Sequence, residues 1–192
     1  MPVEQATIQD IPELVTLVNS AYRGDASKKG WTTEADLLLG ELRTDAASLE
    51  HIFSNEDDVI LKYTTDEGLI AGCVYLQKQG EKLYLGMLSV NPLLQAGGIG
   101  KQLLQAAELH AKQTGCHTIT MTVISAREEL IAWYMRRGYL LTGLNKPFPV
   151  DEKFGVPTQE LLFEVLEKQI VSKLYPHHRH QHVSIPYPLQ KD

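Results

Sequence analysis

Apolar residues in the first third of the chain recur at intervals of three and four positions, which is the spacing of amphipathic helices. The first predicted helix begins at Asp10, with Glu13 closing a capping box, and ends near Arg23. The polar residues 24–30 are expected to form a loop. Two shorter helices should follow, one led by Glu34 and one capped by Asp45 at residues 46–53. The expected buried side of the former consists of Leu37, Leu38 and Leu42.

From residue 59 the pattern changes to alternating apolar and polar positions, which predicts β-strands. Short turns join the first three of these, so they are expected to form an antiparallel meander. Strands are predicted at residues 3–7, 59–63, 69–77, 83–90, 118–123, 139–142 and 159–166. Helices are predicted at residues 99–111 and from a capping box of Ser125 and Glu128 to Arg137. This order predicts an α+β fold, in which a mixed, mostly antiparallel sheet carries helices on its faces.

A glycine-rich loop separates the third strand of the meander from the next helix. Pro92 ends the strand because it has no N–H for the ladder, and Gly97, Gly98 and Gly100 then let the backbone approach a ligand. The loop N–H groups and the helix N-terminus suit a phosphate or pyrophosphate. The G-G-x-G spacing differs from a dinucleotide fingerprint, and only Gly100 and Lys101 match a nucleoside-triphosphate loop. A tight turn without a ligand is the alternative interpretation.

Two motifs in this region resemble those of the GNAT acetyltransferase superfamily. Gln95-x-x-Gly98-x-Gly100 resembles that family's acetyl-CoA loop, and Tyr134-x-x-x-Gly138-Tyr139 resembles its second signature. The resemblance implies a sheet whose fourth and fifth strands splay apart, with the cofactor entering the wedge between them. It also implies acetyl-CoA as co-substrate and an amine of a small molecule or peptide as acceptor, which attacks the thioester directly in a ternary complex.

The resemblance further implies which residues bind the cofactor. The backbone N–H of Val90 would hold the oxyanion. Arg127 stands where the family often has an asparagine, and it could reach a CoA phosphate or lie on the helix surface. The residues expected at the cofactor are Leu88, Val90, Gln95, Ala96, Gly97, Gly98, Ile99, Gly100, Lys101 and Arg127.

The implied reaction needs a proton donor for the departing thiolate. Tyr134 is expected to be this acid, since a thiolate with a pKa around 8.5 needs only a weak donor such as a phenol with a pKa near ~10. Tyr134 also shares an apolar helical face with Leu130 and Ile131, so packing in the core is the alternative role.

The implied reaction also needs a base for the amine and a pocket for the acceptor. Glu34 is the first candidate for the base, and a solvated glutamate favoured by the helix dipole is its alternative. Surface positions are the alternative for the candidate pocket residues, where an arginine would suit an acceptor with a carboxylate. These residues are Tyr22, Arg23, Trp31 and Arg43.

Length, charge and cysteine content limit the possible domain organisation, partners and location. The 192 residues predict one domain, at residues 1–168, followed by a His-rich tail at 169–192. A net charge of −6 argues against nucleic-acid binding. Two cysteines, no apolar span and no secretory signal predict a cytoplasmic protein without a membrane partner, as a monomer or homodimer. No metal is expected, because the tail histidines have no Cys or acidic partner among them.

A second function fits the same motifs, namely a non-catalytic acyl-CoA-binding or interaction module on this fold. The sequence neither names the acceptor nor distinguishes an acetyl donor from a longer acyl donor.

Overall fold

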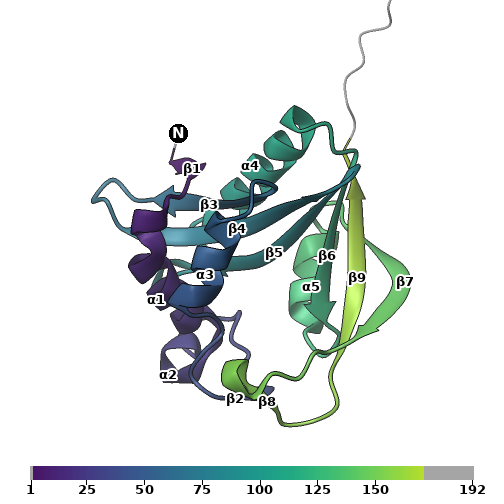
Figure 1. Ribbon diagram of the computed structural model, residues 1–192. Coiled ribbons are helices and arrows are strands. Elements are labelled where there is room, and N and C mark those ends of the chain that lie inside the picture. The colour runs from purple at the N-terminus through teal and green to yellow at the C-terminus, as the bar shows by residue number, and fades with distance from the viewer. Residues whose placement is uncertain (1, 171–192) are drawn as a thin grey trace, which may run out of the picture.

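Seven strands form one mixed sheet in the computed structural model, which describes residues 2–170 (Figure 1). Their order is β1-β3-β4-β5-β6-β9-β7, and every neighbouring pair is antiparallel except β5 and β6. The bounds are β1 (Val3–Gln5), β3 (Asp58–Thr64), β4 (Ile70–Gln79), β5 (Lys82–Val90), β6 (Thr118–Ile124), β7 (Leu140–Pro147) and β9 (Leu162–Gln169). A second, two-stranded sheet pairs β2 (Leu38–Leu39) with β8 (Val156–Pro157).

Helices cover both faces of the large sheet, as the α+β prediction requires. One face carries α1 (Ile11–Tyr22) and α3 (Ala46–Phe53), and the other carries α4 (Ile99–Gln113) and α5 (Glu128–Met135). The remaining helical segments are short. They are α2 (Gly24–Ser27), η1 (Ile8–Asp10), η2 (Pro92–Leu94) and η3 (Glu152–Phe154).

The parallel pair β5 and β6 opens into a wedge. The two strands pair only where Lys82, Leu83 and Tyr84 face Thr118, Ile119 and Thr120. Beyond these pairs β5 continues to Val90 and β6 to Ile124, and Figure 1 shows the two strands diverging from a common start. The register between β4 and β5 shifts near Met87, whose φ is +51°, and such a bulge bends a strand. The predicted splay of these two strands is therefore confirmed.

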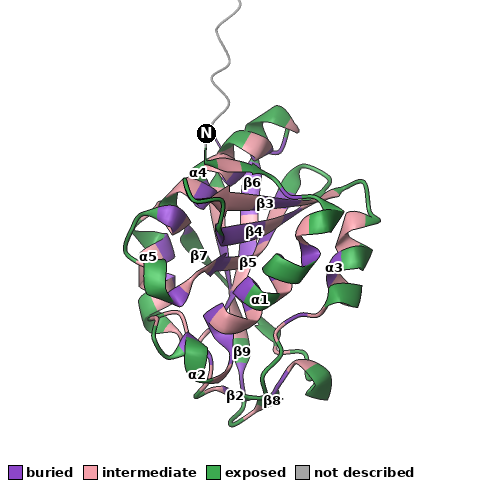
Figure 2. Cartoon of the chain, turned by 90° about the vertical axis from the view of Figure 1, so that its left-hand side faces the viewer, coloured by how far each residue is buried: buried purple, intermediate pink, exposed green. Residues whose placement is uncertain are grey.

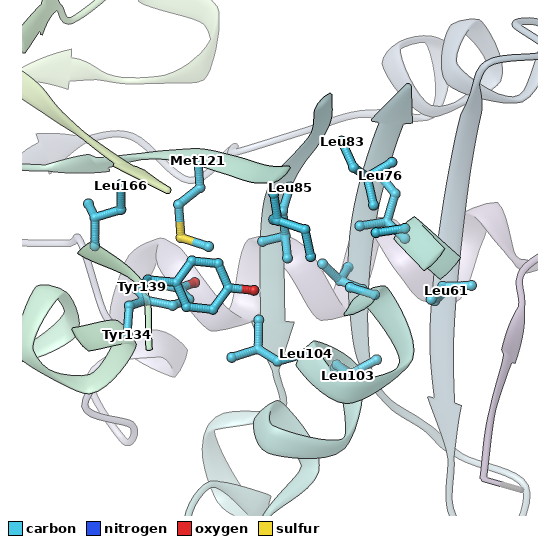
Figure 3. Packing of buried hydrophobic residues seen from close by; sticks show 14 of the residues in the cluster. Leu61, Leu76, Leu83, Leu85, Leu103, Leu104, Met121, Tyr134, Tyr139 and Leu166 are labelled. Atoms are coloured by element: carbon cyan, nitrogen blue, oxygen red, sulfur yellow. The ribbon is translucent and has the colours of Figure 1, made fainter. Parts of the chain in front are cut away.

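Most of the core consists of two large apolar clusters, one on each face of the sheet. Figure 2 shows buried residues gathered on β3, β4 and β5 and on the inner sides of the helices. Between α4, α5 and the sheet, Leu104, Met121 and Tyr139 are almost fully buried. Figure 3 shows Tyr134 and Tyr139 between Met121 of β6 and Leu104 of α4. This packing fixes α5 beside the wedge.

The structure contradicts the helix predicted after Glu34. Residues 34–38 make a single turn, in which the N–H groups of Leu37 and Leu38 both donate to the Glu34 carbonyl. The chain then enters β2, because Leu38 packs into a small cluster with Ile124 and Leu161. Tertiary packing has overridden a helical spacing of leucines. The loop expected at residues 24–30 contains the short helix α2 instead.

The predicted capping boxes of α1 and α5 are also wrong. Asp10 is the N-cap residue of α1 as predicted, but its carboxylate accepts from the Thr7 N–H at 2.7 Å and from Lys62 at 2.9 Å, so it makes no capping bond to α1. The N-cap of α5 is Arg127, whose side chain makes no capping bond, so Ser125 and Glu128 form no capping box. Asp45 caps α3 as predicted and accepts from the Ser48 N–H at 2.9 Å.

The described domain extends two residues past the predicted boundary at 168. Gln169 belongs to β9, and Ile170 is buried and donates its N–H to the His117 carbonyl at 2.7 Å. The rest of the predicted His-rich tail, including His177, His178, His180 and His182, lies outside the described residues. No helix in the described part is long and apolar enough to cross a membrane.

Gly72 sets how closely α4 approaches the sheet. A Cβ at this position would lie 2.8 Å from Ile99 and 3.0 Å from Leu103, both on α4. We expect Gly72→Ala to destabilise the protein by about 1–3 kcal/mol through overpacking, measured by urea unfolding. Gly100→Ala is the matched control, since it adds a methyl group at an ordinary contact inside α4 and should be neutral or stabilise by about 0.5–1 kcal/mol. Equal effects of the two changes would contradict this account.

Candidate functional site

A cavity of about 550 Å³ occupies the wedge and its mouth. Residues of α1, the segment at 31–32, β5, the glycine loop, α4 and α5 line it. Eleven of the residues predicted from the sequence share this lining, and Glu34, Arg23, Arg43, Gly97 and Arg127 do not. The eleven are Tyr22, Trp31, Leu88, Val90, Gln95, Ala96, Gly98, Ile99, Gly100, Lys101 and Tyr134.

The glycine loop at the cavity has the geometry of an anion site. Ala96 and Gly98 have φ angles of +72° and +81°, while Gly97 between them has no positive φ. Residues of alternating hand turn their N–H groups toward one side, which creates a concave site for an anion. The first N–H groups of α4 have no partner within the helix and add to this site. A Cβ at Gly98 would meet no atom within 4 Å, so the space over the loop is open.

The side chain of Gln95 serves a purpose that the motif did not predict. Its Oε1 accepts from the Trp31 N–H at 2.9 Å, and its Nε2 donates to Thr32 Oγ1 at 2.7 Å and to the Val90 carbonyl at 3.3 Å. Both ends of the amide are therefore occupied by protein atoms. Gln95 lines the cavity while its side chain holds the 31–32 segment against the glycine loop.

The backbone of β5 faces the open wedge at Leu88 and Val90. The Asn91 N–H donates to the Ala71 carbonyl of β4 at 2.9 Å. Alternate residues of a strand direct their polar groups to opposite edges, so the Val90 N–H points away from β4 and toward the wedge. The two carbonyls on that edge have partners, since Tyr22 Oη donates to Leu88 and Gln95 donates to Val90. The Val90 N–H is thus placed to bind a ligand oxygen in the wedge.

Tyr134 lies where α5 meets the cavity. It is buried and packs against Trp133 and Tyr139 at ring-centroid separations of 5.0 and 5.8 Å. Burial raises the pKa of its phenol well above the ordinary value, so the hydroxyl remains protonated at neutral pH. The two roles considered for Tyr134 are compatible, because the ring packs in the core while the side chain also lines the cavity.

Glu34 lies in a buried ion-pair network and not beside the cavity. One carboxylate oxygen accepts from Arg23 at 2.5 Å and the other from Arg127 at 3.0 Å. Arg127 also donates to the Thr32 carbonyl at 2.6 Å, and Arg23 donates to the Phe154 carbonyl at 3.1 Å. The Arg127 side chain is therefore not on the helix surface, since only 8% of it is exposed, and its guanidinium is paired with protein groups. Both oxygens of Glu34 are committed to guanidinium groups.

Tyr22 joins this network to the cavity. The guanidinium groups of Arg43 and Arg127 lie 5.8 and 6.0 Å from the centre of its ring. Burial raises the pKa of Tyr22 to about 12, and Glu34 adds to this effect. Its hydroxyl therefore stays protonated and donates to the Leu88 carbonyl. Of the four predicted pocket residues, Tyr22 and Trp31 line the cavity. Arg23 and Arg43 do not line it, because Arg23 pairs with Glu34 and Arg43 lies against the Tyr22 ring.

Several cavity residues were missed by sequence reasoning. Trp133, Arg136 and Arg137 all line the cavity, and the Arg137 guanidinium stacks 3.6 Å from the centre of the Trp133 ring. Helical spacing could have identified two of them. Leu130, Trp133, Tyr134 and Arg137 follow the i, i+3, i+4, i+7 pattern of one helix face, so the motif tyrosine marks the face that they share. Among residues 2–170, no group of three or more His, Cys, Asp or Glu side chains could hold a metal ion.

The family is decided by comparison with known proteins. The model of the acetyltransferase (GNAT) family matches residues 14–139 of this chain. The chain belongs to this family. The matched region includes the glycine loop, the wedge strands and Tyr134, so the family signature coincides with the cavity.

Individual relatives support the fold and do not fix a substrate. An uncharacterized protein of Bacillus subtilis (strain 168), YdhI, is 31% identical over 74 residues, which cover 38% of this chain and 45% of that protein. The ribosomal-protein-S18-alanine N-acetyltransferase of Escherichia coli superimposes with a TM-score of 0.65 at 14% identity, covering 88% of this chain and 94% of that one. The ribosomal-protein-alanine N-acetyltransferase of Brucella melitensis gives 0.66 at 18% identity, covering 88% and 99%. At these identities the structural likeness shows the fold.

The open space over Gly98 provides a test of anion binding. We expect Gly98→Asp to reduce acetyl-CoA affinity at least tenfold more than Gly98→Asn, measured by calorimetry, because a carboxylate would repel the pyrophosphate. The two side chains have nearly the same shape, and both tolerate a positive φ better than most residues, so backbone strain is matched. Equal affinities of the two variants, with both folded, would show that no anion binds at this loop.

Proposed function

We propose that this GNAT family member transfers an acetyl group from acetyl-CoA to the amine of a small molecule or peptide, by direct attack in a ternary complex. The observation that carries the proposal is one continuous cavity. It joins an anion-binding glycine loop to a buried, protonated phenol past an open backbone N–H of β5. A phosphate-bearing thioester needs these three features together.

The lining residues fit coenzyme A. Lys101, Arg136 and Arg137 carry positive charge beside the cavity and suit the phosphate groups. Leu88, Val90 and Leu130 provide apolar surface for the pantetheine arm. A volume of about 550 Å³ lies within the usual range of ligand pockets. Acetyl-CoA would supply an activated acyl group, and the residues of this chain would orient it and handle the protons.

Each polar group of the wedge has a place in the proposed reaction. The amine nitrogen forms a bond to the thioester carbonyl carbon, and the bond between that carbon and sulfur breaks. The Val90 N–H stabilises the negative charge that develops on the carbonyl oxygen. Tyr134 gives its proton to the sulfur as that bond breaks, and the proton that the attacking nitrogen sheds restores the phenol.

Glu34 is a poor candidate for the base that receives the amine proton. Both of its oxygens are paired with arginines, and it does not line the cavity. We assign Glu34 to holding Arg23 and Arg127 in place. The acceptor then reacts as its free amine, having lost one proton to solvent before attack. After attack its nitrogen sheds a second proton, which returns through solvent to the Tyr134 phenolate, so the products are the amide and the thiol.

The proposal also covers the setting of the enzyme. Cys73 and Cys116 are both buried and free, which supports a reducing, cytoplasmic location. No observation favours a particular oligomer, so a monomer and a homodimer both remain compatible with the proposal.

A screen of amines with acetyl-CoA, reading the released thiol, tests the proposed function. Transfer to at least one class of amine, with the acetylated product identified by mass spectrometry, is the expected result. Tight acetyl-CoA binding without turnover on any amine would instead support the acyl-CoA-binding module considered as the second function. Parallel reactions with longer acyl thioesters would establish the preferred donor.

Tyr134→Phe tests the assignment of the acid. The change keeps the ring and its packing and removes only the hydroxyl, so we expect unchanged acetyl-CoA affinity and a fall in kcat of roughly 10²- to 10⁴-fold. Tyr139→Phe is the matched control. The Tyr139 hydroxyl is buried without a hydrogen-bond partner in the described structure, so its removal should leave kcat unchanged and cost no stability. Normal turnover by Tyr134→Phe, with chemistry rate-limiting, would make Tyr134 structural.

The pH dependence follows from the raised pKa of Tyr134. An acid works only while protonated, so its contribution is present below its pKa and is lost above it. Because burial raises that pKa well above its ordinary value, kcat/KM should rise with pH as the amine loses its proton, without a descending limb up to about pH 10. A rate profile over this range checks it. A descending limb in the wild type well below pH 10, absent in Tyr134→Phe, would contradict the raised pKa.

A further inference from the structure

An excess of positive charge surrounds Tyr22, which lines the cavity. Arg23, Arg43 and Arg127 all lie within this region, and Glu34 is the one carboxylate paired with them among residues 2–170. The whole chain carries a net charge of −6, so this concentration of guanidinium groups runs against the overall charge. A half-buried surplus of cations is stabilised when an anion binds there.

Arg43 is the arginine of this group that is free to bind a ligand. Arg23 and Arg127 are committed to Glu34 and to backbone carbonyls. No hydrogen bond or ion pair from the Arg43 guanidinium occurs among the described residues, although its backbone N–H donates to Asn19 at 2.6 Å. The guanidinium is half-buried against the Tyr22 ring instead.

The nearest acidic residues along the chain do not neutralise Arg43. Asp45 is paired with Lys153 and accepts from Ser48, and these contacts hold the pKa of its carboxyl below the usual range. The carboxylate of Glu41 lies against Gly24, where a Cβ would meet it. Asp45 is thus paired with other groups and Glu41 lies against Gly24, so neither neutralises the positive charge of Arg43.

We propose that the acceptor amine carries a carboxylate, as amino acids do, and that Arg43 binds this carboxylate. The inference rests on the proposed function and names the substrate class of the same site. Tyr22 fixes the relation between the two ends of the acceptor. Its hydroxyl reaches Leu88 on β5, where the acetyl group would lie, and its ring contacts the Arg43 guanidinium. One tyrosine side chain therefore separates the reacting carbon from the anion site.

A role for Arg43 in binding coenzyme A is disfavoured by its position. The cations that line the cavity with the glycine loop are Lys101, Arg136 and Arg137, and Arg43 is not among the lining residues. The Arg43 guanidinium instead lies against the ring of Tyr22, a residue of α1. A guanidinium forms two parallel hydrogen bonds to a carboxylate, which would orient the acceptor as well as hold it. Arg43 would thus be a specificity residue for the acceptor.

The test compares amino acids with their amides in the wild type and in Arg43→Gln. Alanine, β-alanine and 4-aminobutyrate increase the separation between amine and carboxylate, and each is paired with its amide. The measured quantity is the ratio of kcat/KM for the acid to kcat/KM for the amide, compared between proteins. Comparing this ratio between proteins cancels the intrinsic difference in amine pKa. We expect Arg43→Gln to lower the ratio about 10- to 100-fold for the best pair.

Two further variants control for charge and folding. Arg43→Lys keeps the charge but loses the paired hydrogen bonds, so it should retain part of the preference. Lys78→Gln removes one positive charge from the exposed end of β4 and should leave the ratio unchanged. A ratio that is the same in Arg43→Gln and the wild type, with thiol released, overturns this inference alone. No thiol release from any amine, with acetyl-CoA bound, overturns the proposed function and this inference with it.

Discussion

The short parallel pairing of β5 and β6 is the constraint on which the rest of the site depends. After three residue pairs β5 loses its neighbour on one edge, so the polar groups of its backbone need other partners. The side chains of Tyr22 and Gln95 satisfy the carbonyls of Leu88 and Val90. The N–H groups on that edge are left for a ligand. The gap in the sheet thus favours a ligand with acceptor oxygens, because the backbone carbonyls on its edge already have partners.

Helix α5 packs beside the wedge and places Tyr134 at the cavity. Its aromatic residues Trp133 and Tyr134 pack between the strands and the cavity, and Tyr139, just after the helix, extends the stack. The N-cap residue of the same helix, Arg127, forms an ion pair with Glu34, which is distant in the sequence. Removing Glu34 would leave two buried guanidinium groups without a counter-charge, which costs far more than a surface ion pair. Packing at one end of α5 and the ion pairs at the other therefore hold the phenol in place.

Sequence patterns predicted the features that depend on residues close together in the sequence. The strands of the large sheet followed from alternation, the α3 cap from Asp45, and the turn before α4 from glycines between a strand and a helix. The failures share a different cause. Leu38 has a helical spacing from its neighbours but packs with Ile124 and Leu161, and Asp10 is drawn to Thr7 and Lys62. Likewise, the pairing of Glu34 with Arg127 joins residues on distant segments, and no local pattern encodes such a contact. For the same reason the sequence did not predict which groups the Gln95 side chain binds.

These long-range contacts form a continuous connection between the glycine loop and the arginines around Tyr22. Gln95, in the glycine loop, binds the backbone and side chain of the 31–32 segment. The Thr32 carbonyl accepts from Arg127, which shares Glu34 with Arg23. Apart from the exposed bond to the Trp31 N–H, each link is a hydrogen bond between buried or half-buried groups, so breaking one of these leaves a polar group unsatisfied. The glycine loop and the arginine cluster are therefore held in one fixed relation, so under the proposed function the site for the acceptor depends on the loop proposed to bind the donor.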